Sequence, residues 1–137
     1  GYFKRRSLKT IVDRGKSVRW EVVYDLLDEK GKDVLTETKT WSLRDDEGRL
    51  VLDLTWAGEA RTDVTISKYS YGGLFLRMPW RRGIKGEAIN SDGKSGGAAE
   101  GKRSNWVDVG MQIDGRDDWG HIVIMDHPDN PGHPTPW

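Results

Sequence analysis

The dominant pattern along the chain is an alternation of apolar and polar residues with a period of two. Between residues 18 and 26 every second side chain is apolar, and the residues between them are mostly charged. This period is typical of a β-strand with one buried and one solvated face. The same kind of pattern predicts further strands over residues 34–43, 50–56, 64–66, 74–80, 106–113 and 121–125.

Turns that contain glycine separate the predicted strands, and no helical period lies between them. Closely spaced strands of this kind favour an antiparallel meander over βαβ units. We therefore predict an all-β fold, an antiparallel β-sandwich of the supersandwich or jelly-roll type. The chain does not begin with Met and stops at Trp137 inside a patterned segment. We expect residues 1–137 to be a single sandwich domain or part of a larger one.

Two segments break the strand pattern. Residues 91–103 are small, polar and rich in glycine, which predicts a flexible surface loop. Residues 127–137 hold most of the prolines of the chain. Because proline lacks an amide hydrogen, this segment is expected to run as an extended, polyproline-like arm.

Composition excludes several classes of protein. The 22 Lys and Arg residues balance the 22 Asp and Glu residues, which argues against nucleic acid as a partner. No stretch approaches the roughly 20 apolar residues that span a bilayer, so no membrane span is expected. The chain has no cysteine, which excludes disulfides and thiolate chemistry. Seven tryptophans need a place to pack, so we expect a folded, soluble domain.

Side chains two residues apart in a strand point to the same face, and we use this strand parity to assign residues to faces. It places a set of polar and aromatic side chains on what we expect to be one sheet face. Its members are Phe75, Arg77, Trp106, Asp108, Gln112, His121 and His127. The two histidines share a face if their strand continues unbroken. Sugars suit such a surface, because aromatic rings stack on their CH faces while planar polar groups bond to the hydroxyls. The alternative is an ordinary solvated face, on which an Arg77–Asp108 pair contributes about 0–1 kcal/mol.

The segment that ends the chain offers a second reading. Asp126, His127 and His133 form an alternative metal set, or one histidine serves as a general acid or base. Their spacing matches no established metal signature, so no cofactor is expected by default. The simpler interpretation is a proline-rich arm that packs over a sheet edge. A third possibility is a non-catalytic module whose arm docks on a partner chain.

Several motifs of the second half resemble the PmoA-like family of bacterial proteins, which are often labelled "methane oxygenase". They are Tyr71-Gly72-Gly73-Leu74, Arg77-Met78-Pro79-Trp80, Trp106-Val107-Asp108, Gly120-His121-Ile122, Asp126-His127-Pro128, Asn130-Pro131 and the run from His133 to Trp137. The resemblance implies a sandwich related to the galactose-mutarotase-like supersandwiches, which bind sugars on a concave sheet face. The methane oxygenase label itself is physically unlikely, because apolar helices and dense copper ligation are missing.

By analogy with mutarotases, His121 or His127 and Asp108 would carry the acid–base work, although the family offers no established catalytic residues to transfer. Arg77, Trp106, Gln112 and Phe75 would bind the ligand. We therefore expect a carbohydrate or a related polar small molecule as the partner, and leave open whether the protein is an enzyme. Carbohydrate work favours a periplasmic or secreted location.

Overall fold

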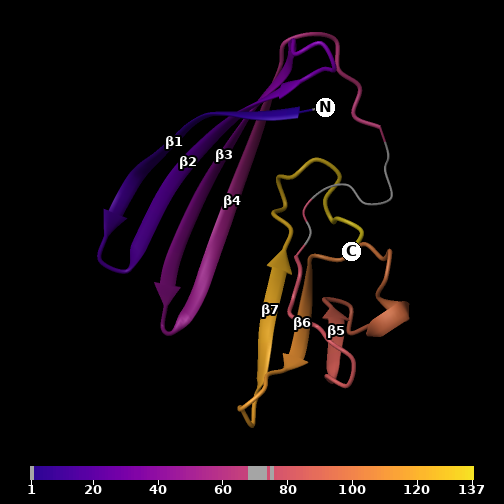
Figure 1. Ribbon diagram of the computed structural model, residues 1–137. Coiled ribbons are helices and arrows are strands. Elements are labelled where there is room, and N and C mark those ends of the chain that lie inside the picture. The colour runs from indigo at the N-terminus through magenta and orange to yellow at the C-terminus, as the bar shows by residue number, and fades with distance from the viewer. Residues whose placement is uncertain (1, 68–73, 75) are drawn as a thin grey trace. The chain divides into compact units, whose positions relative to one another are not determined.

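A computed structural model of the chain describes residues 2–67, 74 and 76–137. These residues form an all-β fold of two antiparallel sheets (Figure 1), which confirms the predicted fold class. The chain divides into an N-terminal unit, residues 1–72, and a C-terminal unit, residues 73–137. The strands of the N-terminal unit are β1 (Tyr2–Arg14), β2 (Ser17–Leu27), β3 (Asp33–Asp46) and β4 (Arg49–Ala60). Those of the C-terminal unit are β5 (Gly86–Asn90), β6 (Trp106–Gln112) and β7 (Trp119–Met125), with a 3-10 turn, η1 (Gly96–Ala98).

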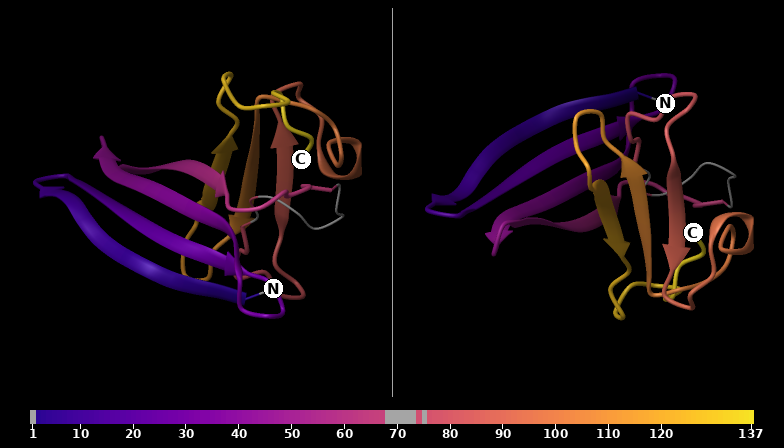
Figure 2. Two further views of the ribbon diagram at one scale, coloured as in Figure 1. Left: turned by 90° about the horizontal axis from the view of Figure 1, so that it is seen from above. Right: turned by 90° about the horizontal axis from the view of Figure 1, so that it is seen from below.

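The N-terminal sheet is a meander in which each strand pairs with the next in sequence, in the order β1-β2-β3-β4. Its long strands curve and twist together (Figure 2). The β3–β4 hairpin closes through Glu47 and Gly48, both with positive φ, while Asp46 pairs with Arg49. A two-residue turn with two positive φ values matches the twist of the strands that it joins. The predicted strands over residues 18–26, 34–43 and 50–56 are confirmed.

Strand β1 was not predicted, and its register explains why. Its pairing with β2 shifts between Arg5 and Ser7 and again between Thr10 and Val12. Each such bulge inserts a residue and reverses which side chains face the core. The apolar residues of β1 therefore show no continuous alternation, although the strand pairs along its whole length.

The two faces of the N-terminal sheet differ in character. One is largely aromatic, with Lys39 and Glu37 among its rings: Trp20 of β2 stacks on Trp41 of β3 at 6.2 Å between ring centres. The other is polar, and its centre is the buried carboxylate of Asp25, which accepts hydrogen bonds from Thr36 and Arg6. This division follows the alternation in the sequence, because successive side chains of a strand point to opposite faces.

The C-terminal sheet has the order β5-β6-β7, and its interior is made by the odd-numbered residues of β6. Val107 and Met111 are buried, and Met111 is only 1% exposed. The strands predicted over residues 106–113 and 121–125 are confirmed in β6 and β7. The short strand β5 was not predicted, since its five residues include a glycine and an alanine and show no marked apolar alternation.

Two predicted strands are wrong. The described residues between 61 and 80 contain no strand, so the expected strands at 64–66 and 74–80 do not form there. Pro79 has no amide hydrogen for a ladder, and the Trp80 amide instead donates to Met78 in a tight turn. Val64 and Ile66 follow the end of β4, and this short alternating segment pairs with no strand among the described residues.

The glycine-rich segment 91–103 is organised around Asn90, which is 1% exposed. Its side-chain oxygen accepts hydrogen bonds from the amides of Asp92 and Lys94. η1 follows and lies beside β5 (Figure 2), and Ala99 after it is buried. The start of the segment is therefore held by backbone hydrogen bonds to the buried side chain of Asn90, and not by the strand-to-strand hydrogen bonds of a sheet.

The proline-rich segment is not the extended arm that was expected. The Asn130 amide donates to His127 and the His133 amide donates to Asn130, which makes two successive turns. After the turns, the backbone amide of Trp137 donates a hydrogen bond to the carbonyl of Lys102, and Pro136 forms an isolated antiparallel β-bridge with Arg103. The residues between the prolines keep their amide hydrogens, and these are enough to fold the segment back onto residues 101–104.

Candidate functional site

The C-terminal sheet presents one face on which polar and aromatic side chains are exposed, and Trp106, Asp108, Gln112 and His121 of the predicted set lie on it. The register of β6 with its two neighbours places alternate residues of all three strands on this face. We call it the histidine face. Its members are Glu87 and Ile89 of β5; Trp106, Asp108, Gly110 and Gln112 of β6; and Trp119, His121, Val123 and Met125 of β7.

The centre of the histidine face is an Asp–His pair. The Nδ1 atom of His121 lies 3.0 Å from one carboxylate oxygen of Asp108 and 3.2 Å from the other. The two residues are diagonal neighbours, because His121 is directly opposite Gly110 and Asp108 precedes Gly110 by two residues in β6. The side chains are accessible: that of Asp108 is 31% exposed and that of His121 is 53% exposed.

Gly110 makes this geometry possible. A Cβ atom at this position would lie 2.6 Å from Cε1 of the His121 ring, well inside van der Waals contact. The imidazole therefore lies across the backbone of β6, in the space that a larger residue would fill. This brings Nδ1 to the carboxylate instead of letting the ring stand away from the sheet.

The pairing fixes what the second ring nitrogen can do. An ionised carboxylate only accepts hydrogen bonds, so the neutral imidazole carries its proton on Nδ1. The lone pair is then on Nε2, which has no hydrogen-bond partner among the described residues. An imidazole held in one tautomer by a carboxylate is the usual arrangement of a general base.

Two tryptophans flank the pair along the strands. Trp106 precedes Asp108 by two residues and is paired with Met125; Trp119 precedes His121 by two and is paired with Gln112. Since the strands are antiparallel, the two indoles mark opposite ends of a surface about 20 Å long, at about 3.3 Å per residue. They are 37% and 38% exposed, so part of each ring is open to a ligand.

The other residues expected at this site do not join it. Phe75 lies outside the described residues. Arg77 is exposed and lies in a segment without strand structure, so the parity argument does not apply to it. His127 is two residues beyond the end of β7, and its side chain is 70% exposed. The strand does not continue as expected, because the chain turns at Asp126 and the next residues form the first of the two turns.

Asp126 is the centre of a second, enclosed cluster. One of its oxygens accepts a hydrogen bond from the side-chain amide of Asn130 at 2.7 Å. The other oxygen accepts a hydrogen bond from the Thr135 backbone amide at 2.8 Å and lies 2.9 Å from His133 Nδ1. The carboxylate is only 5% exposed. The hydrogen bond from Asn130, together with those from Thr135 and His133, lowers the pKa of Asp126 from 3.8 to about 2.

The structure does not bring together the alternative metal set. Nδ1 of His127 accepts a hydrogen bond from the Asp129 amide instead of lying beside Asp126 and His133. Across the described residues, no three His, Cys, Asp or Glu side chains are grouped so that they could hold a metal ion. The Asp126 cluster serves to close the two turns of the terminal segment.

Comparison with known proteins then gives the family. A family model described as a family of unknown function, DUF6807, matches residues 1–137. The chain belongs to the DUF6807 family. No curated protein and no solved structure matches it. The predicted membership of the PmoA-like family is therefore corrected: the match is to DUF6807, and nothing in the comparisons shows a PmoA-like relationship.

Sequence reasoning missed Trp119 and Glu87 of this DUF6807 chain. Trp119 could have been found, because it precedes His121 by two residues and so shares its face in a strand. Glu87 could not, since β5 shows no clear strand pattern. Its position opposite Gly110 depends on the register of β5, and the sequence pattern does not predict that strand.

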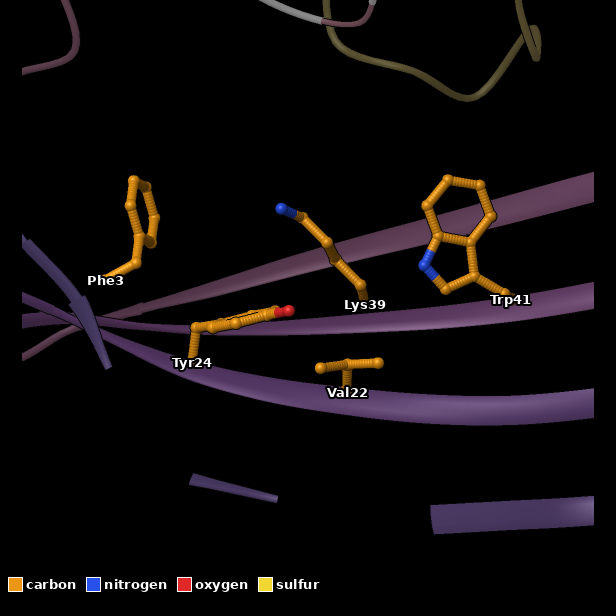
Figure 3. Close-up of a pocket in the computed structure, with 5 residues that line it drawn as sticks. All are labelled: Phe3, Val22, Tyr24, Lys39 and Trp41. Atoms are coloured by element: carbon orange, nitrogen blue, oxygen red, sulfur yellow. The ribbon is translucent and has the colours of Figure 1, made fainter. Parts of the chain in front are cut away.

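It also missed an aromatic cavity in the N-terminal unit of the DUF6807 chain. A hollow of about 340 Å³ lies on the aromatic face of the sheet (Figure 3). Its lining residues are Phe3, Val22, Tyr24, Lys39 and Trp41. Parity alone places Val22 and Tyr24 on one face, but the neighbours that complete the hollow depend on cross-strand register. No helix of the described residues has the length and apolar character needed to cross a membrane.

Proposed function

We propose that the histidine face binds a carbohydrate, with Asp108 and His121 at the centre of the site. The observation that carries the proposal is the paired, exposed Asp108–His121 couple between two partly exposed tryptophans on one sheet face. Sugars combine apolar CH faces with a dense array of hydroxyl groups, and this surface offers a matching group for each.

The tryptophans supply the apolar contacts. An indole that lies against a sugar ring gains from buried area and from its electron-rich face. Trp106 and Trp119 keep more than a third of their surface open, and they are separated by the Asp–His couple. A saccharide of more than one ring that follows the strands would contact both indoles and cover the couple between them.

The polar groups between the indoles supply direction. Asp108 accepts hydrogen bonds from sugar hydroxyls, Nε2 of His121 accepts one more, and the amide of Gln112 both donates and accepts. A hydroxyl on Nε2 also lies where the imidazole accepts its proton, because Nδ1 on the other side of the ring is held by Asp108. The same geometry thus supports binding in the ground state and proton transfer at an anomeric hydroxyl.

The proposal is tested by titrating the chain with glucose, galactose, xylose and their short oligomers, followed by NMR and calorimetry. We expect shifts at the indole signals of Trp106 and Trp119 and at the His121 ring, with oligomers binding more tightly than monomers. The variants Trp106→Ala and Asp108→Asn are expected to weaken binding by about tenfold or more, which corresponds to the loss of about 1.4 kcal/mol.

Trp80→Ala is the matched control, since Trp80 is an exposed tryptophan of the same unit that lies over Gly86, off the histidine face. Binding that survives the Trp106 and Asp108 changes but is lost with Trp80 would contradict the proposal. So would a panel in which no sugar shifts the signals of the histidine face.

A further inference from the structure

The aromatic cavity of the N-terminal unit has the shape of an open box on three strands. Figure 3 shows the Tyr24 ring lying flat beside Val22, which together form the floor. Phe3 and Trp41 stand up at the two ends, and Lys39 lies between them. Phe3 meets the edge of Tyr24 at 6.3 Å between ring centres, and this contact holds that wall in place.

The polar atoms of the box point to its middle. The hydroxyl of Tyr24 and the indole nitrogen of Trp41 are both directed toward Lys39 (Figure 3). Among the residues that the structure describes, neither group has a hydrogen-bond partner in the protein. Two donors without acceptors, on the floor and one wall of a hollow, are placed for a ligand that brings acceptor oxygens.

Lys39 adds a positive charge between these donors. Its ammonium lies 5.6 Å from the centre of the Tyr24 ring and 2.9 Å from the carboxylate of Glu37. An ammonium has three hydrogens, so at least one stays available for a ligand after these contacts. The box therefore offers donors and a cation on an open surface that aromatic rings flank.

Glu37 positions the lysine from beside the box, because it is paired with Tyr24 across β2 and β3 and so lies on the same face of the sheet. It is 8% exposed, is not part of the lining, and one of its oxygens accepts the indole hydrogen of Trp56 at 2.7 Å. The Trp56 ring lies over Gly58, where a Cβ would overlap it. The other Glu37 oxygen is buried without a hydrogen-bond partner in the protein. A buried carboxylate is costly, and its best-placed cation is Lys39, which explains why the ammonium stays over the box.

We propose that this box is a second binding site, which takes a small molecule with one ring and a carboxylate group. The ring lies on Tyr24 between the walls of Phe3 and Trp41, and the carboxylate accepts hydrogen bonds from Lys39, Trp41 and Tyr24. A volume of about 340 Å³ suits a ligand of this size. The preference is opposite to that of the histidine face, whose members include the Asp108 and Glu87 carboxylates and no lysine or arginine.

The test compares molecules that differ in the carboxylate alone. Phenylacetate and 2-phenylethanol are titrated separately into the chain, and glucuronate and glucose form a second pair, with NMR shifts to locate binding. We expect each carboxylate to bind about tenfold or more tightly than its neutral counterpart and to shift Tyr24 and Trp41. Equal affinities within both pairs, shifts confined to other residues, or no binding at millimolar concentration would overturn the proposal.

Variants assign the contacts. Trp41→Phe keeps the wall and removes the indole donor, so it should weaken carboxylate binding several-fold. Lys39→Met combined with Glu37→Gln removes the cation without leaving a buried charge, and should abolish the preference for the carboxylate. Lys9→Met is the matched control, because Lys9 also pairs with a glutamate of β2, Glu21, at 3.0 Å. A preference that persists in the double variant, or is lost in the control, would contradict the site.

This test also separates the box from the histidine face, because the two lie on different sheets and report through different side chains. Loss of sugar binding in Asp108→Asn leaves the phenylacetate result unchanged if both proposals hold. Failure of one site therefore does not conceal the outcome at the other.

Discussion

Two Asp–His pairs in the C-terminal unit have nearly the same geometry and very different surroundings. His121 lies 3.0 Å from Asp108, and His133 lies 2.9 Å from Asp126. The carboxylate of Asp126 is 5% exposed and accepts two further hydrogen bonds, whereas Asp108 is 31% exposed and has His121 as its partner. Distance alone therefore does not identify a functional pair. The Asp126 carboxylate already accepts several hydrogen bonds within the protein and stabilises the fold. The more exposed Asp108 carboxylate can still accept hydrogen bonds from a ligand.

A third pair extends the comparison. His127 and Asp129 are 3.8 Å apart, and the Asp129 side chain is 92% exposed. All three histidines of the chain thus have an aspartate neighbour, in environments that run from enclosed to fully open. Stability should respond to the aspartates in that order, and ligand binding should respond to the middle pair.

The largest effect is expected from Asp126→Ala. The change removes the acceptor of hydrogen bonds from Asn130, Thr135 and His133, and leaves those donors without a partner inside the two turns. We expect the melting temperature to fall by about 5–10 °C. Thermal unfolding followed by circular dichroism gives the measurement.

Asp108→Ala is the matched control for this prediction, and it should lower the melting temperature by about 4 °C or less, as for other accessible pairs. If the two substitutions destabilise the chain equally, the distinction between an enclosed and an open pair is wrong.

A smaller effect is expected from acid. The folded pKa of Asp126, about 2, lies below its ordinary value of 3.8. A lowered pKa means that the stabilisation is complete above about pH 4 and is lost as the pH falls toward 2. Urea unfolding midpoints between pH 5 and pH 2.5 should therefore fall more steeply for the natural chain than for Asp126→Asn. Parallel curves would show that Asp126 does not contribute to the acid sensitivity.

Gly110→Ala tests the open pair by steric means. The new methyl group overlaps the His121 ring and forces it away from Asp108. Because the ring is half exposed and can move, we expect a cost of only about 1 kcal/mol. The proton on Nδ1 should then exchange faster with water, and sugar affinity should fall by about tenfold. Nitrogen NMR of the imidazole gives the first measurement.

Gly97→Ala serves as the control for this substitution, because a Cβ at Gly97 meets nothing within 4 Å. An unchanged imidazole signal in Gly110→Ala would show that the glycine is not what lets the ring reach the carboxylate.

The smallest effect is expected from Asp129→Ala. The pair with His127 is exposed and long, and exposed pairs contribute little because water screens them. The melting temperature should change by about 1 °C or less, and sugar binding should not change. A clear loss of either would place this segment in the site or in the core, against the description given above.

The sequence predicts the strands whose side chains alternate cleanly and misses those that do not. β2 and β6 follow from the period of two, because one face of each is apolar. β1 is hidden by two bulges that reverse its parity, and β5 by its small residues. The false strand at 74–80 shows the converse: its residues alternate, but Pro79 lacks an amide hydrogen and the described residues of the segment pair with no strand.

For the candidate sites, too, the sequence predicts which residues of one strand share a face, but not how neighbouring strands are aligned. Asp108 and Trp106 share a face because parity within one strand is fixed by the pleat. Their relation to His121 was only an expectation, since cross-strand register depends on the turn after β6. His127 was misplaced because a strand was assumed to continue past Met125. The aromatic box needs three strands in register, one of them bulged, and no pattern within a single strand contains that information.

The two bulges of β1 also bear on self-association. β1 lies at the border of its sheet, where unpaired backbone groups can recruit a strand from a second molecule. Each bulge interrupts that row of donors and acceptors, and Lys4 and Arg5 add like charges that repel another copy of the same strand. The same irregularity that hides β1 from the alternation pattern is one of the features by which edge strands in general disfavour pairing with a further strand.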